Sequence, residues 1–113
     1  MSKLKKAIRL ASKDNVATLL EDADKKDKIE VVDEANQIVG EFEALQAIPF
    51  GNKIALEQIA DQQMVSKAGY PVGIAVKPIA EGDLVHVQNV RSTRVDIPEN
   101  IIQQIIQQMQ IEC

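Results

Sequence analysis

The polar residues between positions 86 and 91 have side chains that could do chemistry together. They are His86, Gln88, Asn89 and Arg91, and His86 is the only histidine of the chain. The alternating pattern of residues 84–89 predicts a strand, in which positions 84, 86 and 88 share one face. An imidazole and a carboxamide on that face, with a guanidinium nearby, would suit a polyhydroxylated or anionic small molecule. A simply solvated strand face is the alternative, and composition does not decide between them.

Most other catalytic arrangements are missing from the sequence. A Ser–His–Asp or Cys–His arrangement would have to use His86, and no serine lies in a glycine-flanked nucleophile turn. A zinc site draws three or four ligands from His, Cys and carboxylates, whereas this chain has one His and a single cysteine, Cys113. His86 is therefore the only candidate metal ligand. No glycine-rich phosphate loop is present.

Size and composition indicate one small globular domain. The chain has 113 residues, of which 45% are hydrophobic and 27% charged, with a formal net charge of −4. An acidic chain without a concentrated basic face is not expected to bind nucleic acid. No apolar run approaches the ~20 residues of a membrane-spanning helix, so no membrane association is expected. A single cysteine excludes an internal disulfide, which favours a cytoplasmic location.

An internal repeat organises the middle of the chain. Residues 54–65 read IALEQIADQQMV and residues 74–85 read IAVKPIAEGDLV, with the matching residues twenty positions apart. Each copy reads as a strand, a polar turn and a second strand, which predicts a compact β structure with pseudo-two-fold character. Gly82 provides the second turn with a residue that tolerates positive φ. Pro78 predicts an edge strand or a bulge, because proline cannot donate to a ladder.

The segments on either side of the repeat predict more strands and two helices. Strands are expected over residues 6–10, 29–32 and 37–42, with residues 33–36 as a hairpin turn. A short N-terminal helix is expected from Asp14, as N-cap, through Ala23, with Val16, Leu19 and Leu20 on its apolar face. Residues 47–53 are expected to form a loop that enters the repeat.

The end of the chain predicts an amphipathic helix with Asp96 as its N-cap and Pro98 in its first turn. Its apolar stripe consists of Ile97, Ile101, Ile102, Ile105, Ile106 and Met109. The opposite face is glutamine rather than charge. The helix is expected to dock on the sheet, and the alternative is that it mediates self-association or packs on a partner. We therefore divide the chain into a β domain over residues 1–94 and a C-terminal helical extension over residues 95–113.

Three separated motifs resemble the SAF-type domain of the altronate and galactarate dehydratase family. They are KDNVATLL (13–20), IPFGNKIALEQIA (48–60) and VSKAGYPVGIAVKPIAEGDLVHVQN (65–89), and the likeness extends over about residues 7–91. The resemblance implies a mainly β, β-clip (SAF-like) fold. It also implies a small subunit beside a larger one, as in the related sulfolactate sulfo-lyase. The larger partner would carry most of the chemistry, the elimination of water or sulfite from a sugar acid or 2-hydroxy acid, with iron or another divalent metal.

The family motifs map onto particular positions of this chain. His86 and Asn89 fall on the family's VHxHN segment, and Lys53 falls on its GHK turn. Asp14 and Asn15 fall on its DNV segment, and Lys67 and Gly69 on its KYG segment. At four places the chain departs from the pattern, because the expected histidines and tyrosine are replaced by Ala11-Ser12, Asn52, Ala68 and Gln88. Asn and Gln can hydrogen-bond, but they cannot transfer protons near neutral pH.

Two hypotheses account for these residues. In the first, the chain is a subunit of a carbon–oxygen lyase (a hydro-lyase) that is not active alone. His86 would act as acid/base or metal ligand, Asn89 would orient it, and the other substrate-binding candidates would be Lys53, Arg91, Asn52 and Gln88. In the second, the chain is a stand-alone, non-catalytic binding or assembly module that has lost the family's site histidines and forms a homo-oligomer through its C-terminal helix.

Overall fold

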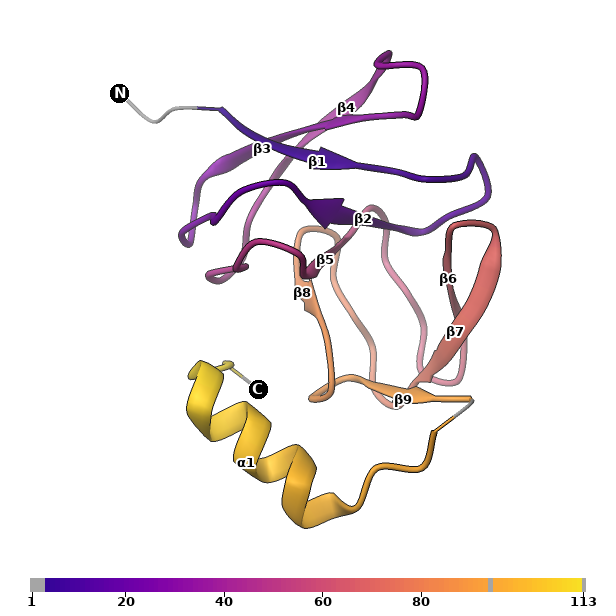
Figure 1. The fold of residues 1–113 in the computed structure, drawn as a ribbon, viewed down its shortest axis with the longest axis vertical. Helices are drawn as coiled ribbons and strands as arrows, with labels where there is room; N and C mark the ends of the chain where they lie inside the picture. Colours follow the sequence, from indigo (N-terminus) through magenta and orange to yellow (C-terminus); the bar gives the residue numbers. More distant parts are fainter. Residues whose placement is uncertain (1–3, 94, 113) are drawn as a thin grey trace.

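The computed structural model describes residues 4–93 and 95–112 and contains two sheets and one C-terminal helix (Figure 1). The six-stranded sheet has the order β4-β3-β1-β2-β5-β8, and the three-stranded sheet has the order β6-β7-β9. The strands of the first sheet are β1 (Lys5–Ile8), β2 (Val16–Leu19), β3 (Lys28–Val32), β4 (Ile38–Glu43), β5 (Lys53–Ala55) and β8 (Leu84–Val85). Those of the second sheet are β6 (Met64–Lys67), β7 (Tyr70–Ala75) and β9 (Val90–Ser92). The mainly β prediction is confirmed.

The two copies of the repeat pair with each other around a pseudo-two-fold axis. Ile54 of β5 lies opposite Leu84 of β8, and the equivalent Ile74 of β7 lies opposite Met64 of β6. At the centre, Ile59 and Ile79 form an isolated antiparallel bridge, with N–O distances of 2.9 and 2.8 Å. The predicted pseudo-symmetry is therefore confirmed.

The turn of each copy donates a backbone hydrogen bond to the last residue of a strand in the other copy. The Gln62 amide donates to the carbonyl of Ala75 at 2.7 Å, and the Gly82 amide donates to the carbonyl of Ala55 at 2.8 Å. Both turn residues have positive φ, 71° at Gln62 and 91° at Gly82. A Cβ at position 82 would also collide with the carbonyl oxygen of Glu43, so that only glycine fits there.

The predicted N-terminal helix is wrong, because the segment from Val16 to Leu19 is strand β2. This strand lies between β1 and β5, inside the six-stranded sheet, where Val16, Ala17 and Leu19 are all buried. Leu20, which the helical stripe would have buried, is exposed instead. A short apolar run bounded by polar residues fits a buried strand as well as a helix turn, and here sheet pairing decides.

The expected role of Pro78 is also corrected. The residue belongs to no strand and no bulge, since β7 ends at Ala75 and Pro78 lies in irregular backbone just before the bridge at Ile79. Its missing N–H therefore removes no ladder hydrogen bond. The hairpin turn over residues 33–36 is confirmed, because β3 and β4 pair antiparallel on either side of it.

Helix α1 (Glu99–Met109) folds back beneath the sheets (Figure 1). It begins at Glu99, later than predicted, with Pro98 at the N-cap position, so Asp96 is not its cap. Ile106, Met109 and the following Ile111 pack against the main apolar core, which confirms that the helix docks on the β structure. That core is built chiefly from strands β1, β2, β3 and β5, and a second, smaller core lies inside the repeat.

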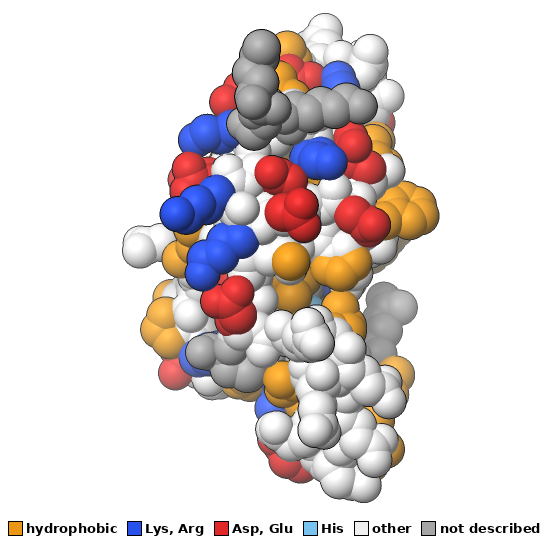
Figure 2. Space-filling view, turned by 90° about the vertical axis from the view of Figure 1, so that its left-hand side faces the viewer, with side chains coloured by type: hydrophobic (Ala, Val, Ile, Leu, Met, Phe, Trp, Pro, Cys, Tyr) orange, Lys and Arg blue, Asp and Glu red, His pale blue; other side chains and the backbone are white. Residues whose placement is uncertain are grey.

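The surface that carries α1 differs from the rest of the same face. Figure 2 shows positive and negative side chains over the upper part of this face, whereas the part formed by the helix is mostly uncoloured. The sequence explains the contrast, because residues 100–111 contain no charged side chain. Within the described residues, no helix has the length and hydropathy needed to cross a membrane.

Candidate functional site

Two of the predicted site residues line one pocket. The cavity has a volume of about 220 Å³ and lies between β5, β7, β9 and the segment that follows β8. Its polar side chains are Lys53, His86 and Ser92, and its apolar walls are Val72, Val87, Val90 and Ile97. The pocket therefore combines one ammonium group and the only imidazole of the chain with a largely aliphatic wall.

His86 lies in a turn rather than in the predicted strand. Strand β8 ends at Val85, and the carbonyl of His86 accepts hydrogen bonds from the amides of Asn89 at 3.1 Å and Val90 at 3.0 Å. The prediction that positions 84, 86 and 88 share a strand face is therefore wrong. Gln88 is buried, and its Nε2 donates to the carbonyl of Leu84 at 2.8 Å. Its side chain therefore stabilises the turn.

The Asn89 side chain fixes the backbone on both sides of Val85. Its Oδ1 accepts from the His86 amide at 3.0 Å, and its Nδ2 donates to the Leu84 carbonyl at 2.8 Å. Asn89 is 1% exposed, so both bonds are shielded from water. The buried Asn89 carboxamide therefore fixes the backbone of His86, which lines the pocket, while Asn89 itself does not line it.

The first copy of the repeat has the same asparagine clamp, made by a distant residue. Asn15 donates from Nδ2 to the Met64 carbonyl at 3.0 Å, and its Oδ1 accepts from the Ser66 amide at 3.0 Å. Positions 64 and 66 are the repeat equivalents of 84 and 86. The neighbouring Asp14 carboxylate accepts from the amides of Ala11, Ala68 and Gly69, at 2.7–3.0 Å. Asp14, predicted as a helix cap, thus connects the loop between β1 and β2 to the β6–β7 turn.

Burial and positive charge both act on the two polar groups of the pocket. The pKa of Lys53 is lowered from its ordinary value of 10.5, mainly by burial and further by the charge of Lys67. The pKa of His86 is lowered from 6.5 by burial and by the charge of Lys53. His86 is consequently a neutral imidazole at pH 7. Among the described residues, neither side chain has a hydrogen-bond or ion-pair partner.

The remaining predicted site residues point elsewhere. The Asn52 side chain donates to the Pro49 carbonyl at 3.2 Å. The Arg91 guanidinium binds the Val87 carbonyl and forms an ion pair of 3.5 Å with Glu99 at the start of α1. Asn52, Gln88 and Arg91 thus do not line the pocket with His86.

Sequence reasoning missed the walls of the pocket. Ser92 and Val72 come together because β7 and β9 pair, with Gly73 opposite Ser92. This pairing joins segments that no local pattern connects. Gly73 is the one local signal, because a Cβ there would lie 2.7 Å from the Arg91 carbonyl oxygen, and glycine inside a strand marks a close approach.

The described residues do not fit a divalent metal by themselves. They contain no group of three or more His, Cys, Asp or Glu side chains close enough to share an ion. His86 has a lysine as its charged neighbour rather than a carboxylate. A cation at His86 would therefore need ligands from outside the described residues.

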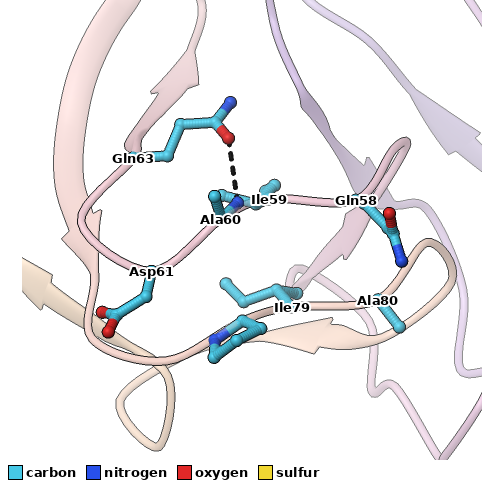
Figure 3. A pocket seen from close by; sticks show the side chains of 8 residues that line it. Gln58, Ile59, Ala60, Asp61, Gln63, Ile79 and Ala80 are labelled. Atoms are coloured by element: carbon cyan, nitrogen blue, oxygen red, sulfur yellow. Dashed lines mark hydrogen bonds between the residues drawn. The ribbon is translucent and has the colours of Figure 1, made fainter.

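A second pocket, of about 500 Å³, lies where the two copies of the repeat cross. Ile59 and Ile79 line it, and Gln63 accepts a hydrogen bond from the Ala60 amide there at 2.9 Å (Figure 3). The side chains of Gln58 and Asp61 lie at opposite ends of this pocket (Figure 3). Because no polar groups converge, this pocket is less suited to chemistry than the one at His86.

Comparison with known proteins gives a consistent result. Residues 5–93 match the model of the altronate/galactarate dehydratase SAF domain. The chain is 39% identical over 54 residues to (2R)-sulfolactate sulfo-lyase subunit alpha of Chromohalobacter salexigens, which is 48% of this chain and 57% of that protein. It is 30% identical over 94 residues to altronate dehydratase of Bacillus subtilis, and 35% identical over 92 residues to that of Escherichia coli. These matches cover 83% and 81% of this chain but only 18% and 17% of the two dehydratases.

Proposed function

The chain belongs to the altronate/galactarate dehydratase SAF domain family, and we propose from this membership and from the His86 pocket that it is the accessory part of a dehydratase-type lyase. The proposed reaction is elimination of water, or of sulfite, from a sugar acid or 2-hydroxy acid. The observation that carries the proposal is the presence of Lys53 and His86, both without a partner among the described residues, in one pocket.

The two side chains have complementary tasks in such a reaction. The Lys53 ammonium would bind the carboxylate of the acid, since a charge-assisted hydrogen bond is the strongest contact available there. The neutral imidazole of His86 would accept a proton or orient the hydroxyl that leaves. Asn89 would be a positioning residue that acts through the backbone of His86.

The pocket provides only part of what an elimination needs. One proton leaves carbon, and the departing hydroxide or sulfite takes its bonding electrons with it, so an acid and a base are both useful. His86 can fill one of these roles, and Lys53, the other titratable side chain of the described pocket, is assigned to the carboxylate of the acid. We therefore propose that a larger catalytic subunit completes the site and that it holds any iron or other divalent metal the reaction uses.

Reconstitution with the larger protein tests this function. The tagged chain should retain a larger protein from the lysate of the source organism, and mixing the two should produce lyase activity that neither shows alone. His86→Ala should lower kcat of the mixture by about 100-fold, the lower range for loss of an acid/base group. Lys28→Gln is the control, because Lys28 lies in β3 and pairs with Glu43. Full activity of the larger protein alone would contradict the proposal.

The alternative function rests on α1. Apart from Glu99 and Asn100 in its first turn, its exposed side chains are glutamines and Ile101, a surface on which two acidic chains can meet with little like-charge repulsion. If the chain is a non-catalytic assembly module, it should be recovered alone as a homo-oligomer. Light scattering of a chain ending near residue 94 would then show a smaller species than the full chain. An unchanged oligomeric state would exclude the helix as the interface.

A further inference from the structure

One wall of the His86 pocket comes from outside the two sheets. Ile97 lines this pocket together with Lys53 and His86, and it lies in the segment between β9 and α1. Residues 95–98 of that segment form neither helix nor strand. The match to the family model ends at residue 93, so this wall is formed by residues that lie beyond the matched region.

The segment is loosely packed against the rest of the chain. A cavity of about 90 Å³ lies between it and β9, and the lining includes Arg91, Ile97 and Ile102. Of residues 95–98, only Ile97 is partly buried. Ile102 of α1, in contrast, is 2% exposed. The helix is therefore firmly anchored from Ile102 onward, whereas the residues before it have space to shift without breaking close contacts.

Arg91 connects this segment to the turn that carries His86. Its guanidinium binds the carbonyl of Val87, the residue after His86, and forms the ion pair of 3.5 Å with Glu99 at the start of α1. The two side chains are 38% and 67% exposed. An ion pair that is this exposed is weak and is screened by salt. Pro98, at the N-cap position, adds no side-chain hydrogen bond to hold the first turn of the helix.

We propose that residues 95–99 form a flap over the His86 pocket and that the ion pair between Arg91 and Glu99 holds the flap closed. In the closed state Ile97 completes the aliphatic wall. Opening is a local event of a segment with few buried contacts, and it removes Ile97 from the wall and gives solutes access to His86. Arg91, which the sequence predicts to bind substrate, is then the latch of the flap. The inference goes beyond the proposed function, because it holds for a lyase subunit and for a non-catalytic module alike.

Chemical modification of His86 measures how often the flap is open. Diethyl pyrocarbonate acylates neutral imidazole, and His86 is the only histidine, so in a chain without a histidine tag the ultraviolet absorbance of the product follows one site. Rates are taken at pH 7 relative to that of N-acetylhistidine. Ile97→Ala should raise the rate, because it shortens the side chain that covers His86. Ile101→Ala is the matched control, since Ile101 is exposed on α1 and lines neither cavity, and it should leave the rate unchanged.

A second pair of variants tests the latch. Glu99→Gln should raise the modification rate by about two- to fivefold, the range that an exposed ion pair supports. Glu43→Gln removes the same charge from the exposed pair with Lys28 and should have no effect. Added salt should raise the rate in the unsubstituted chain but not in Glu99→Gln, where no ion pair is left to screen.

Two results would overturn the proposal. An unchanged rate in Ile97→Ala would show that residues 95–99 do not cover His86. An unchanged rate in Glu99→Gln, or a salt effect that survives this substitution, would show that the ion pair does not hold them closed. The modification assay uses the chain alone, so its outcome is independent of the reconstitution with a larger protein.

Discussion

The two copies of the repeat share a backbone arrangement but carry different side chains at its clamped positions. Asn89 clamps positions 84 and 86, and Asn15 clamps the equivalent positions 64 and 66 with the same two hydrogen bonds. In the second copy the clamped residue is His86 in the pocket, whereas in the first copy it is Ser66. The clamp is thus a structural feature of the repeat, and in the second copy it holds the backbone of a residue that lines a pocket, His86.

The turns show a second difference. Gln62 and Gly82 occupy equivalent positions with similar positive φ, so conformation alone does not demand glycine. What distinguishes position 82 is the carbonyl oxygen of Glu43, at the end of β4, which takes the space that a Cβ would need. In the first copy, the equivalent residue is Gln62, and its side chain is exposed on the surface.

Removing the glycine from the second turn and introducing one into the first should change stability by very different amounts, and this is the largest difference that we expect between the two copies. Gly82→Ala combines a strained φ with a backbone collision and should lower the free energy of unfolding by about 3 kcal/mol or more. Gln62→Gly removes strain but adds freedom to the unfolded chain, and it should change stability by less than about 1 kcal/mol. Urea denaturation measures both. Equal losses would break the proposed distinction between the turns.

Removing the two asparagine clamps should have similar effects on stability and different effects on the site. Asn15→Ala and Asn89→Ala each delete two hydrogen bonds of a buried carboxamide, and each should cost about 2 kcal/mol. Only Asn89→Ala should shift the NMR signals of His86, because only Asn89 binds its amide. A comparable shift in Asn15→Ala would mean that the two clamps are not independent.

The pKa of His86 should respond to the lysine beside it. Lys53→Met removes one of the two causes that lower it, so an NMR titration should show a higher pKa than in the unsubstituted chain. The lowered pKa also sets the direction of the stability change with pH. Between the pKa of folded His86 and the unfolded value of about 6.5, the unfolded chain binds more protons, so stability falls as the pH decreases through this range.

Lys53→Met should make that fall shallower, and urea denaturation as a function of pH would measure it. An unchanged pKa would show that burial alone controls His86. The equivalent Ser66 in the first copy has no titration in this range, so the pH effect belongs to the second copy.

The smallest expected difference concerns positions 63 and 83. The Asp83 carboxylate accepts from Gln46 Nε2 at 2.9 Å, and Gln46 also bonds the backbone of Glu112 beyond α1. The side chain of Gln63 has one hydrogen bond within the described residues, which it accepts from the exposed Ala60 amide. Asp83→Ala should cost about 1 kcal/mol and Gln63→Ala about 0.5 kcal/mol. A larger loss at Gln63 would contradict the view that the second copy carries the connection to the helix.

Local patterns predict the elements whose signal is local. The hairpin of β3 and β4, the repeat and α1 follow from turn residues, periodicity and self-similarity. The prediction fails at strand β2 because the short apolar run over residues 16–20 fits both a strand and a helix. It extends the strand over residues 84–89 too far because the Asn89 clamp turns the chain at His86. The β-clip name stays a prediction.

The sequence predicts the site residues that lie in recognisable motifs, but not those that strand pairing brings to the pocket. Lys53 and His86 come from motif resemblance, and they do share a pocket. The pairing of Gly73 with Ser92, which brings Ser92 and Val72 to the same pocket, depends on strands brought together by the whole fold. Arg91 lies close to His86 in sequence, but the Val87 carbonyl and Glu99 hold its guanidinium at the start of α1.

The hydrogen bonds that each turn of the repeat makes with the other copy have a consequence for folding. Because Gln62 closes the strand at Ala75 and Gly82 closes the strand at Ala55, neither copy has a complete set of backbone partners until the other is in place. A fragment with one copy would have to obtain those partners from a second molecule, as a domain-swapped pair does.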